Sequence, residues 1–179
     1  MKKVLRLFIC IFILALAASF VLDKIEVKYK SAIDAVSAEY SLDEKLVYAL
    51  IMAESNFHPD AHSVKGATGL MQLTDDTAAW CAEKIGDASL AEKITEPDAN
   101  IRLGCFYLKY LLEKYGGSES AALAAYNAGS SNVDEWLSDS AYSPDGVSLT
   151  GAPFPETDRY IKKIAIYKKI YTLLYGDIL

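Results

Sequence analysis

The sequence predicts a mainly α-helical fold, with one globular helical domain behind an N-terminal hydrophobic segment. Three observations support this prediction. Strand signals are scarce, apolar residues recur at helical spacing along several segments, and residues that favour helix starts precede these segments. The chain has 179 residues, which is enough for one domain with a sizeable core but not comfortably for two.

The first 22 residues have the pattern of an export signal. Basic residues at the start precede an unbroken stretch from Leu7 to Leu22 in which only Ser19 is polar. Signal-peptide cores span about 7–15 residues and membrane-spanning helices about 17–25, so this stretch falls between the two. A small-x-small pattern ending at Ser19 fits a cleavage site, but apolar residues follow it directly, and we favour an uncleaved anchor over residues 1–22. Both outcomes place the rest of the chain beyond the membrane, either tethered to its extracytoplasmic face or secreted.

Composition argues against one class of partner. The net charge is −6 and the pI is near 4.9, which disfavours nucleic acid because phosphate binding needs clustered cations. Twelve tyrosines against six phenylalanines suit a sugar-binding groove, although a core or interface role is commoner for tyrosine. Cys81 and Cys105 could pair outside the membrane, or they could be two small buried residues on neighbouring helices. No Cys/His spacing resembles a metal site, so we expect neither a metal nor a cofactor.

After the anchor, residues 23–40 are expected to form a charged amphipathic linker helix, and residues 41–176 the folded domain. Ser41 and Glu44 have the spacing of a capping box, which predicts a helix that runs to about Ser55. Gly-, Ser- and Pro-containing segments predict a loop at 56–70 and a long one at 139–156.

The remaining helices are placed by their starting residues. Thr74, Ser118 and Ser131 are suitable caps, and Pro97 fits a first helical position. The predicted spans are 75–85, 97 to about 115, 119–127, 132–138 and about 157–175. In the last helix one stripe is expected to face inward and the lysines outward; the stripe is Tyr160, Ile164, Tyr167, Tyr171 and Leu174, and the lysines are Lys162, Lys163, Lys168 and Lys169.

One acidic residue interrupts an apolar helix face. Val47, Leu50, Ile51 and Glu54 stand at i, i+3, i+4 and i+7. Glu54 therefore points towards the core side at a helix C-terminus, where the macrodipole disfavours negative charge. Burial and the dipole both favour the protonated carboxyl, which could then donate a proton near neutral pH, as glycosidic cleavage requires. The alternative is that the helix ends one residue earlier and Glu54 is a solvated terminal residue.

Four motifs in order give this sequence a family resemblance. They are Glu54-Ser55-Asn56-Phe57-His58-Pro59, then Ser63-Val64-Lys65-Gly66-Ala67-Thr68-Gly69-Leu70-Met71-Gln72-Leu73, then Ala121-Ala122-Leu123-Ala124-Ala125-Tyr126-Asn127-Ala128-Gly129, and Pro155-Glu156-Thr157-Asp158-Arg159-Tyr160. The series resembles the soluble lytic transglycosylase (SLT domain) family, whose α+β lysozyme-like fold is close to goose-type lysozyme. The resemblance covers about residues 40–175. Tyr-Asn-Ala-Gly alone would be a weak signal, whereas four motifs in the family's order are highly specific.

The resemblance implies a role for each motif. Glu54 matches the family's single catalytic acid/base, and the positions implied to bind substrate are Gly69, Met71, Gln72, Tyr126, Asn127, Glu156 and Tyr160. The tyrosine hydroxyl of the Tyr126–Asn127 pair is implied to lie near the acid, and Glu156 and Tyr160 to close the groove around the muramic-acid sugar. Asp75 stands where the family often has proline, which leaves the local turn open.

Each of these positions also has a purely structural explanation. Gly69 could only permit a tight turn, and Met71 could fill the core. Tyr126 could pack beside the alanine run, and Asn127 could cap its own helix. Glu156 could sit near a helix N-terminus for electrostatic reasons alone. Tyr160 lies on the apolar stripe, so core and site are compatible there.

The implied reaction is cleavage of the bond between N-acetylmuramic acid and N-acetylglucosamine without water, leaving a 1,6-anhydro end. The expected partners are peptidoglycan strands and, through the N-terminal segment, a membrane; we expect a monomer. One alternative is a hydrolytic muramidase, whose water-positioning group could lie in the 139–156 loop. Another is a non-catalytic glycan-binding scaffold, which could dispense with the acid.

Overall fold

The computed structural model describes residue 12 and residues 27–176. In this range the helices are α2 (Lys30–Tyr40), α3 (Glu44–Glu54), α4 (Asp75–Ile85), α5 (Ser89–Glu92), α6 (Pro97–Lys114), α7 (Glu119–Ala128), α8 (Ser130–Leu137) and α9 (Pro155–Tyr175). The prediction of a mainly helical fold is confirmed. None of the described helices has the length and apolar character needed to cross a membrane. Apart from residue 12, the predicted anchor over 1–22 lies outside the described residues.

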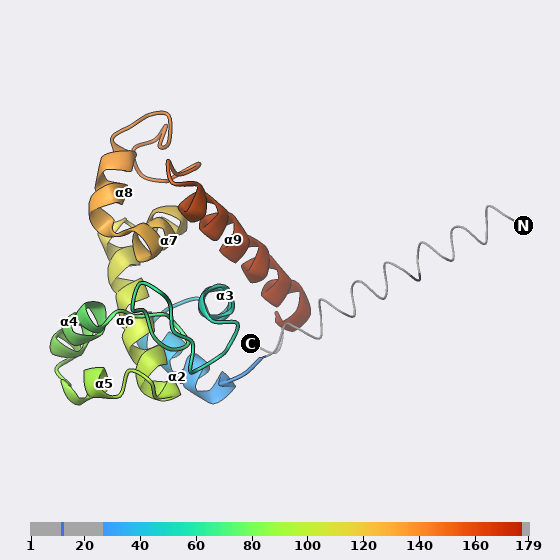
Figure 1. Cartoon of the computed structure of the whole chain (residues 1–179). Coiled ribbons are helices and arrows are strands. Elements are labelled where there is room, and N and C mark those ends of the chain that lie inside the picture. Colours follow the sequence, from blue (N-terminus) through green and yellow to red (C-terminus); the bar gives the residue numbers. More distant parts are fainter. Residues whose placement is uncertain (1–11, 13–26, 177–179) are drawn as a thin grey trace, which may run out of the picture.

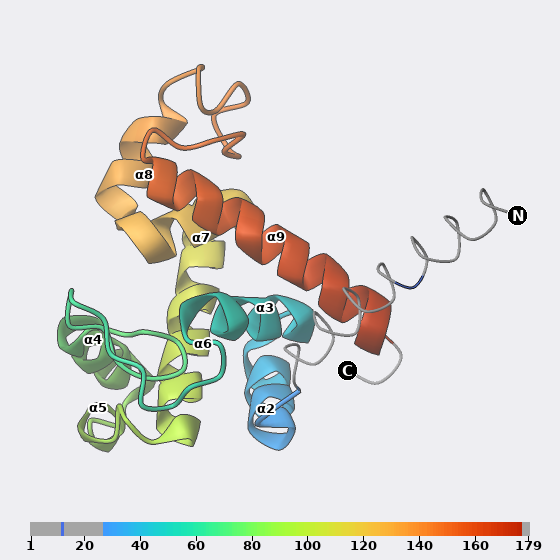
Figure 2. The same cartoon turned by 45° about the vertical axis from the view of Figure 1, so that its right-hand side comes forward.

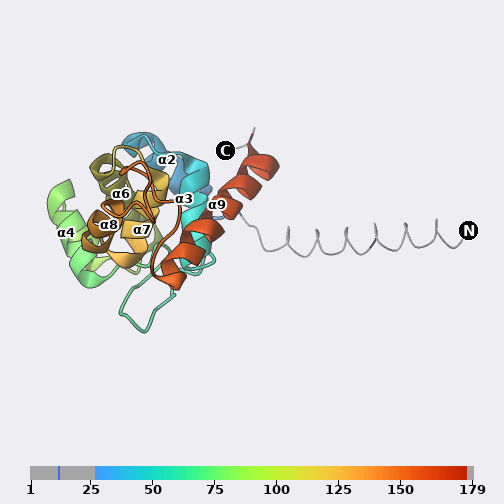
Figure 3. The same ribbon diagram turned by 90° about the horizontal axis from the view of Figure 1, so that it is seen from above.

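The long helix α6 organises the arrangement of the others. Figures 1 and 2 show α4 and α5 near one end of α6, and α7 and α8 near the other end. Helix α3 lies between these groups, and α9 runs obliquely past it. The described strand pairing is limited to isolated bridges at Thr68, with His62 and with Leu73, in the loop after α3. This loop projects beside the first half of α9 (Figure 3).

Local signals set most helix ends as predicted. The Thr74 hydroxyl accepts a hydrogen bond from the Thr77 amide, and α4 spans 75–85. The Ser118 hydroxyl accepts one from the Ala121 amide at the start of α7. Pro97 is the first residue of α6, where its missing N–H costs nothing.

Two of the predicted caps are wrong. The cap of α3 is Asp43, whose carboxylate accepts a hydrogen bond from the Lys45 amide at 2.9 Å. Ser41 instead ends α2 in a left-handed conformation, with φ 55°. Ser131 lies inside α8, which begins one residue earlier, after Gly129. In the first case Ser41 itself takes the positive φ of the turn, and in the second the turn residue is Gly129, with φ 86°.

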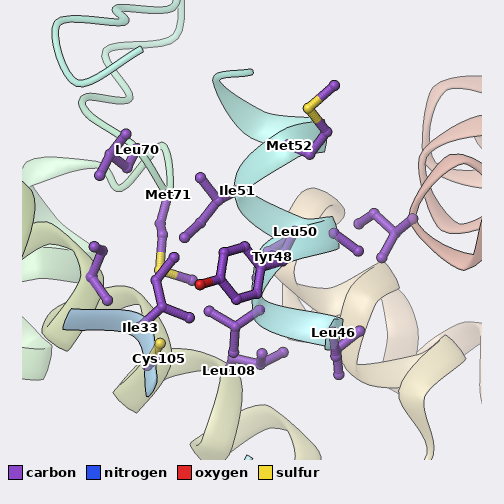
Figure 4. Close-up of a cluster of buried hydrophobic side chains, with 14 of the residues drawn as sticks. Ile33, Leu46, Tyr48, Leu50, Ile51, Met52, Leu70, Met71, Cys105 and Leu108 are labelled. Carbon is purple, nitrogen blue, oxygen red and sulfur yellow. The ribbon is translucent and has the colours of Figure 1, made fainter. Parts of the chain in front are cut away.

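The main core surrounds α3 on all sides. The seven consecutive residues 46–52 are all buried, so α3 is not amphipathic along this stretch. Figure 4 shows Tyr48 among side chains that come from several elements, including Ile33 and Met71. Ile33 belongs to α2 and is fully buried. The segment expected to be a linker therefore contributes directly to the core.

Two further expectations about side chains are settled by burial. Cys81 and Cys105 are free, buried thiols, so the core explanation holds and the disulfide does not. Burial raises the pKa of Cys81 to about 12 and that of Cys105 still further, so neither forms a thiolate at neutral pH. On α9 Leu174 is exposed rather than inward, and the next residue, Tyr175, packs against the core instead.

Candidate active site

Glu54 is the last residue of α3 and is half-buried. The Tyr160 hydroxyl, from α9, donates a hydrogen bond to its Oε1 atom. Burial raises the pKa of Glu54 to about 7, while the bond from Tyr160 and the positive charge of Lys163 act in the opposite direction. The carboxyl is therefore poised between its acid and base forms near neutral pH.

Tyr160 is a permanent donor to this carboxyl. It is buried, and burial together with the negative charge of Glu54 raises its own pKa well above its ordinary value. Its hydroxyl thus keeps its proton whether Glu54 is neutral or charged. A hydrogen bond to the charged form stabilises a carboxylate, so the bond from Tyr160 limits the rise in the pKa of Glu54 that burial causes.

The loop that faces Glu54 is fixed by a buried amide, that of Asn100 on α6. Its Oδ1 accepts from the Met71 amide at 2.8 Å, and its Nδ2 donates to the Thr68 carbonyl at 3.0 Å. Gly69 passes so close that a Cβ there would lie 2.3 Å from Asn100 Nδ2, and its φ is +82°. Gly69 is required for this close approach. The role of Asn100 was not predicted from the sequence, although a polar residue among the apolar residues of this helix could have indicated it.

Gln72, Met71 and Tyr126 come together but act differently. The Gln72 amide donates to the carbonyls of Ala61 and Gly69, at 3.0 and 2.9 Å, and Gln72 has a left-handed φ of 48°. The Met71 side chain is fully buried, so the core role is the one observed. The Tyr126 hydroxyl donates to the Met71 carbonyl at 2.8 Å. The hydroxyl that bonds the acid is that of Tyr160, not that of Tyr126.

Asn127, near the end of α7, and Glu156, in the first turn of α9, each connect α9 to another part of the chain. The Asn127 Oδ1 accepts a hydrogen bond from the Thr157 hydroxyl at 2.8 Å, which ties the end of α7 to α9. Glu156 is exposed and forms an ion pair with Lys65, 3.8 Å away, at the tip of the loop after α3. This ion pair connects the loop to the first turn of α9.

An open pocket of about 480 Å³ lies against Glu54. Its lining residues are Met52, Ala53, Glu54, Ser55, Asn56, Ala61, His62, Ser63, Gln72, Lys163 and Tyr167. Glu54 is the one carboxylic acid in this lining. Asn56 and Gln72 have positive φ angles of 51° and 48°, and such strain outside glycine gathers at functional sites.

Lys163 is exposed, as predicted, but its place in this site was not predicted from the sequence. Its Nζ donates to the Ala53 carbonyl at 2.9 Å, and it lines the pocket. Its spacing of three residues from Tyr160 was the signal, since i and i+3 share a helix face. No cluster of three potential metal ligands among His, Cys, Asp and Glu occurs within the described part of the chain.

A family model and two similar proteins agree on one protein family. The Transglycosylase SLT domain family matches residues 31–146. The soluble lytic murein transglycosylase of Escherichia coli K12 is 32% identical over 162 residues, which cover 87% of this chain and 25% of that protein. A putative soluble lytic murein transglycosylase of Haemophilus influenzae is 32% identical over 148 residues, covering 82% of this chain and 25% of the relative. The chain thus spans about a quarter of the length of these relatives.

Solved structures agree with this result. An inactive glutamate-to-glutamine mutant of the lytic transglycosylase Slt from Pseudomonas aeruginosa superposes with a TM-score of 0.75 and 30% identity, over 85% of this chain and 25% of that one. The 70-kDa soluble lytic transglycosylase in complex with bulgecin A gives a TM-score of 0.76 and 27% identity, over 86% and 25% of the two chains.

Proposed function

Because this chain belongs to the transglycosylase SLT domain family, we propose that it cleaves the glycan strands of peptidoglycan as a lytic transglycosylase. Glu54 serves as its single acid and base. The observation that carries the proposal is a half-buried carboxyl with a pKa of about 7, in contact with the buried Tyr160 and facing an open pocket. An inactive glutamate-to-glutamine mutant of a similar transglycosylase supports a carboxylate-dependent reaction.

The reaction begins with proton donation. Neutral Glu54 protonates the oxygen that links N-acetylmuramic acid to N-acetylglucosamine, and this bond breaks as the leaving sugar takes the proton. The 2-acetamido group of the muramic sugar stabilises the positive anomeric centre. Tyr160 then stabilises the newly formed Glu54 carboxylate through its hydrogen bond.

The second step returns the proton to the enzyme. The Glu54 carboxylate accepts the proton of the 6-hydroxyl of the same sugar, and the oxygen closes onto the anomeric carbon. An intramolecular hydroxyl can have an effective molarity of about 10⁵ M or more, which lets it compete with water. One carboxyl is sufficient for this cycle, whereas ordinary glycosidases need two.

Two measurements test this proposal. Mass spectrometry of digested peptidoglycan should find 1,6-anhydromuramyl ends, which are one water lighter than hydrolysed ends; hydrolysed ends alone would identify a muramidase. Glu54→Gln should abolish cleavage and keep the fold, while Glu83→Gln, at an exposed carboxyl, should change neither. Substantial residual cleavage by Glu54→Gln would contradict the role of Glu54.

We also propose that the chain acts as a monomer at the extracytoplasmic face of a membrane, with residues 1–22 as its anchor. The support is the basic start and apolar stretch of the sequence, and the need to reach wall glycan. N-terminal sequencing of the protein recovered from membranes tests the anchor. A mature N-terminus after Ser19 would replace the anchored form by a secreted one.

A further inference from the structure

Lys163 introduces a positive charge into the pocket beside Glu54. It lies on α9, where its ammonium donates a hydrogen bond to the Ala53 carbonyl, near the end of α3, and sits 5.7 Å from the centre of the Tyr167 ring. These contacts hold the charge at the pocket wall. Its charge lowers the pKa of Glu54, but the reaction proposed above gives this ammonium no contact with the substrate.

The charge of Lys163 lacks a carboxylate partner, unlike that of its neighbours on α9. Lys162 pairs with Asp158 at 2.7 Å, and Lys168 pairs with Asp43 and Glu119. Within residues 27–176, no acidic group comes within 4.0 Å of the Lys163 ammonium. An ammonium has three N–H donors, and the bond to Ala53 uses one of them.

The rest of the pocket suits a polar, anionic group. Asn56 and Ser63 offer neutral hydrogen-bonding groups around the same space, whereas the Gln72 amide nitrogen already donates to two carbonyls. The one acid of the lining, Glu54, has a pKa of about 7, so its neutral and charged forms are about equally populated at pH 7. A local positive charge in a protein of net charge −6 marks this spot as a site for a negative group.

We propose that Lys163 binds a carboxylate carried by the muramic-acid sugar that Glu54 cleaves, an inference that rests on the proposed function. Muramic acid differs from N-acetylglucosamine by a lactyl group. This group ends in a free carboxylate on peptide-free strands, and on intact strands it continues into a stem peptide that carries carboxylates of its own. With the anomeric carbon at Glu54, substituents of the same sugar extend into the adjoining pocket. Lys163 is then a residue that determines specificity for muramic acid.

Three forms of glycan strand separate these sources of the carboxylate. They are intact strands with stem peptides, strands freed of peptides by an amidase, and peptide-free strands whose carboxylates have been converted to methylamides. For the wild-type full chain we expect kcat/KM on the methylamide strands to be about tenfold below that on at least one carboxylate-bearing form, as for loss of a charge-assisted hydrogen bond. A higher kcat/KM on peptide-free strands identifies the lactyl carboxylate as the bound group, and a higher kcat/KM on intact strands identifies a stem-peptide carboxylate.

Variants assign this preference to Lys163. With each enzyme measured at its own pH optimum, because loss of the Lys163 charge also raises the pKa of Glu54, Lys163→Met should lose the roughly tenfold preference for the carboxylate-bearing strands over the methylamide strands. Lys163→Arg should keep the preference. Lys162→Met is the matched control, because Lys162 lies outside the pocket and pairs with Asp158. Binding should show the same pattern. The Glu54→Gln chain should bind the preferred strands more tightly than the methylamide strands, and adding Lys163→Met to this chain should remove the difference in Kd.

Several results would overturn the proposal. One is a wild-type enzyme that cleaves methylamide strands as well as the others, and this comparison needs no variant to fold. Another is a Lys163→Met variant that, measured at its own pH optimum, loses activity equally on all three forms, because Lys163 would then act only on Glu54 or on the end of α3. A wild type that cleaves none of the strands would refute the proposed function instead, and strand binding by the Glu54→Gln chain would still decide the role of Lys163.

Discussion

The raised pKa of Glu54 predicts that the acid destabilises the fold at the pH where it works. The pKa is about 7 in the folded chain against an ordinary value of 4.5. Between these values the folded state binds more protons than the unfolded state, so stability decreases as the pH rises. Each pKa unit corresponds to about 1.4 kcal/mol. The free energy of unfolding should therefore decrease by about 3 kcal/mol as the pH rises from below 4.5 to above 7.

Glu54→Gln removes this titration and keeps the shape of the side chain. The free energy of unfolding of the variant minus that of the wild type should therefore rise by about 3 kcal/mol between pH 4.5 and pH 7, and stay level above pH 8. Urea unfolding at five or six pH values measures this difference directly. Glu83→Gln is the control, because the Glu83 side chain is 75% exposed.

The refuting result is specific. A difference that is flat across this pH range would mean that Glu54 titrates as an ordinary surface carboxyl, and a difference that falls with pH would mean that the folded state favours the carboxylate. Either result would remove the physical basis for a proton donor at neutral pH. Loss of activity in Glu54→Gln, by contrast, would not distinguish a tuned acid from a residue that only binds substrate.

Three other predictions concern single contacts. Tyr160→Phe removes a charge-assisted hydrogen bond of about 1.5 kcal/mol or more, so the alkaline limb of the pH–rate profile should move up by about one pH unit; an unmoved limb would show that the bond does not tune Glu54. Gly69→Ala forces a Cβ against Asn100 at positive φ and should lower the free energy of unfolding by more than about 1 kcal/mol in urea titrations; an unchanged midpoint would contradict the required close approach. Tyr48→Phe removes a buried hydroxyl that has no partner and should leave thermal stability unchanged or raise it by up to about 1 kcal/mol; a marked loss would indicate a hidden hydrogen bond.

Local signals were sufficient for most of the fold. Thr74 and Ser118 accept hydrogen bonds from amides within one helical turn, and Pro97 suits a first helical position, so the starts of three helices could be predicted directly. Ser41 and Asp43 were harder to separate, since both suit a cap and the choice depends on how α2 ends against the core. The spacing of apolar residues on one helix face could not predict that α3 is buried on all sides, because this burial results from packing against both α2 and α9.

The sequence by itself determined the mainly helical class, the family resemblance and the choice of Glu54 as the candidate acid. The tertiary structure decided which groups meet that acid. Tyr160 bonds Glu54 from 106 positions along the chain, and Lys163 bonds the Ala53 carbonyl from 110 positions away. Helix periodicity and capping act over a few residues, whereas the pKa of a carboxyl depends on burial and on charges brought close by the packing of distant segments. The charge state of the site is therefore a property of how α3, α9 and the loop after α3 pack together.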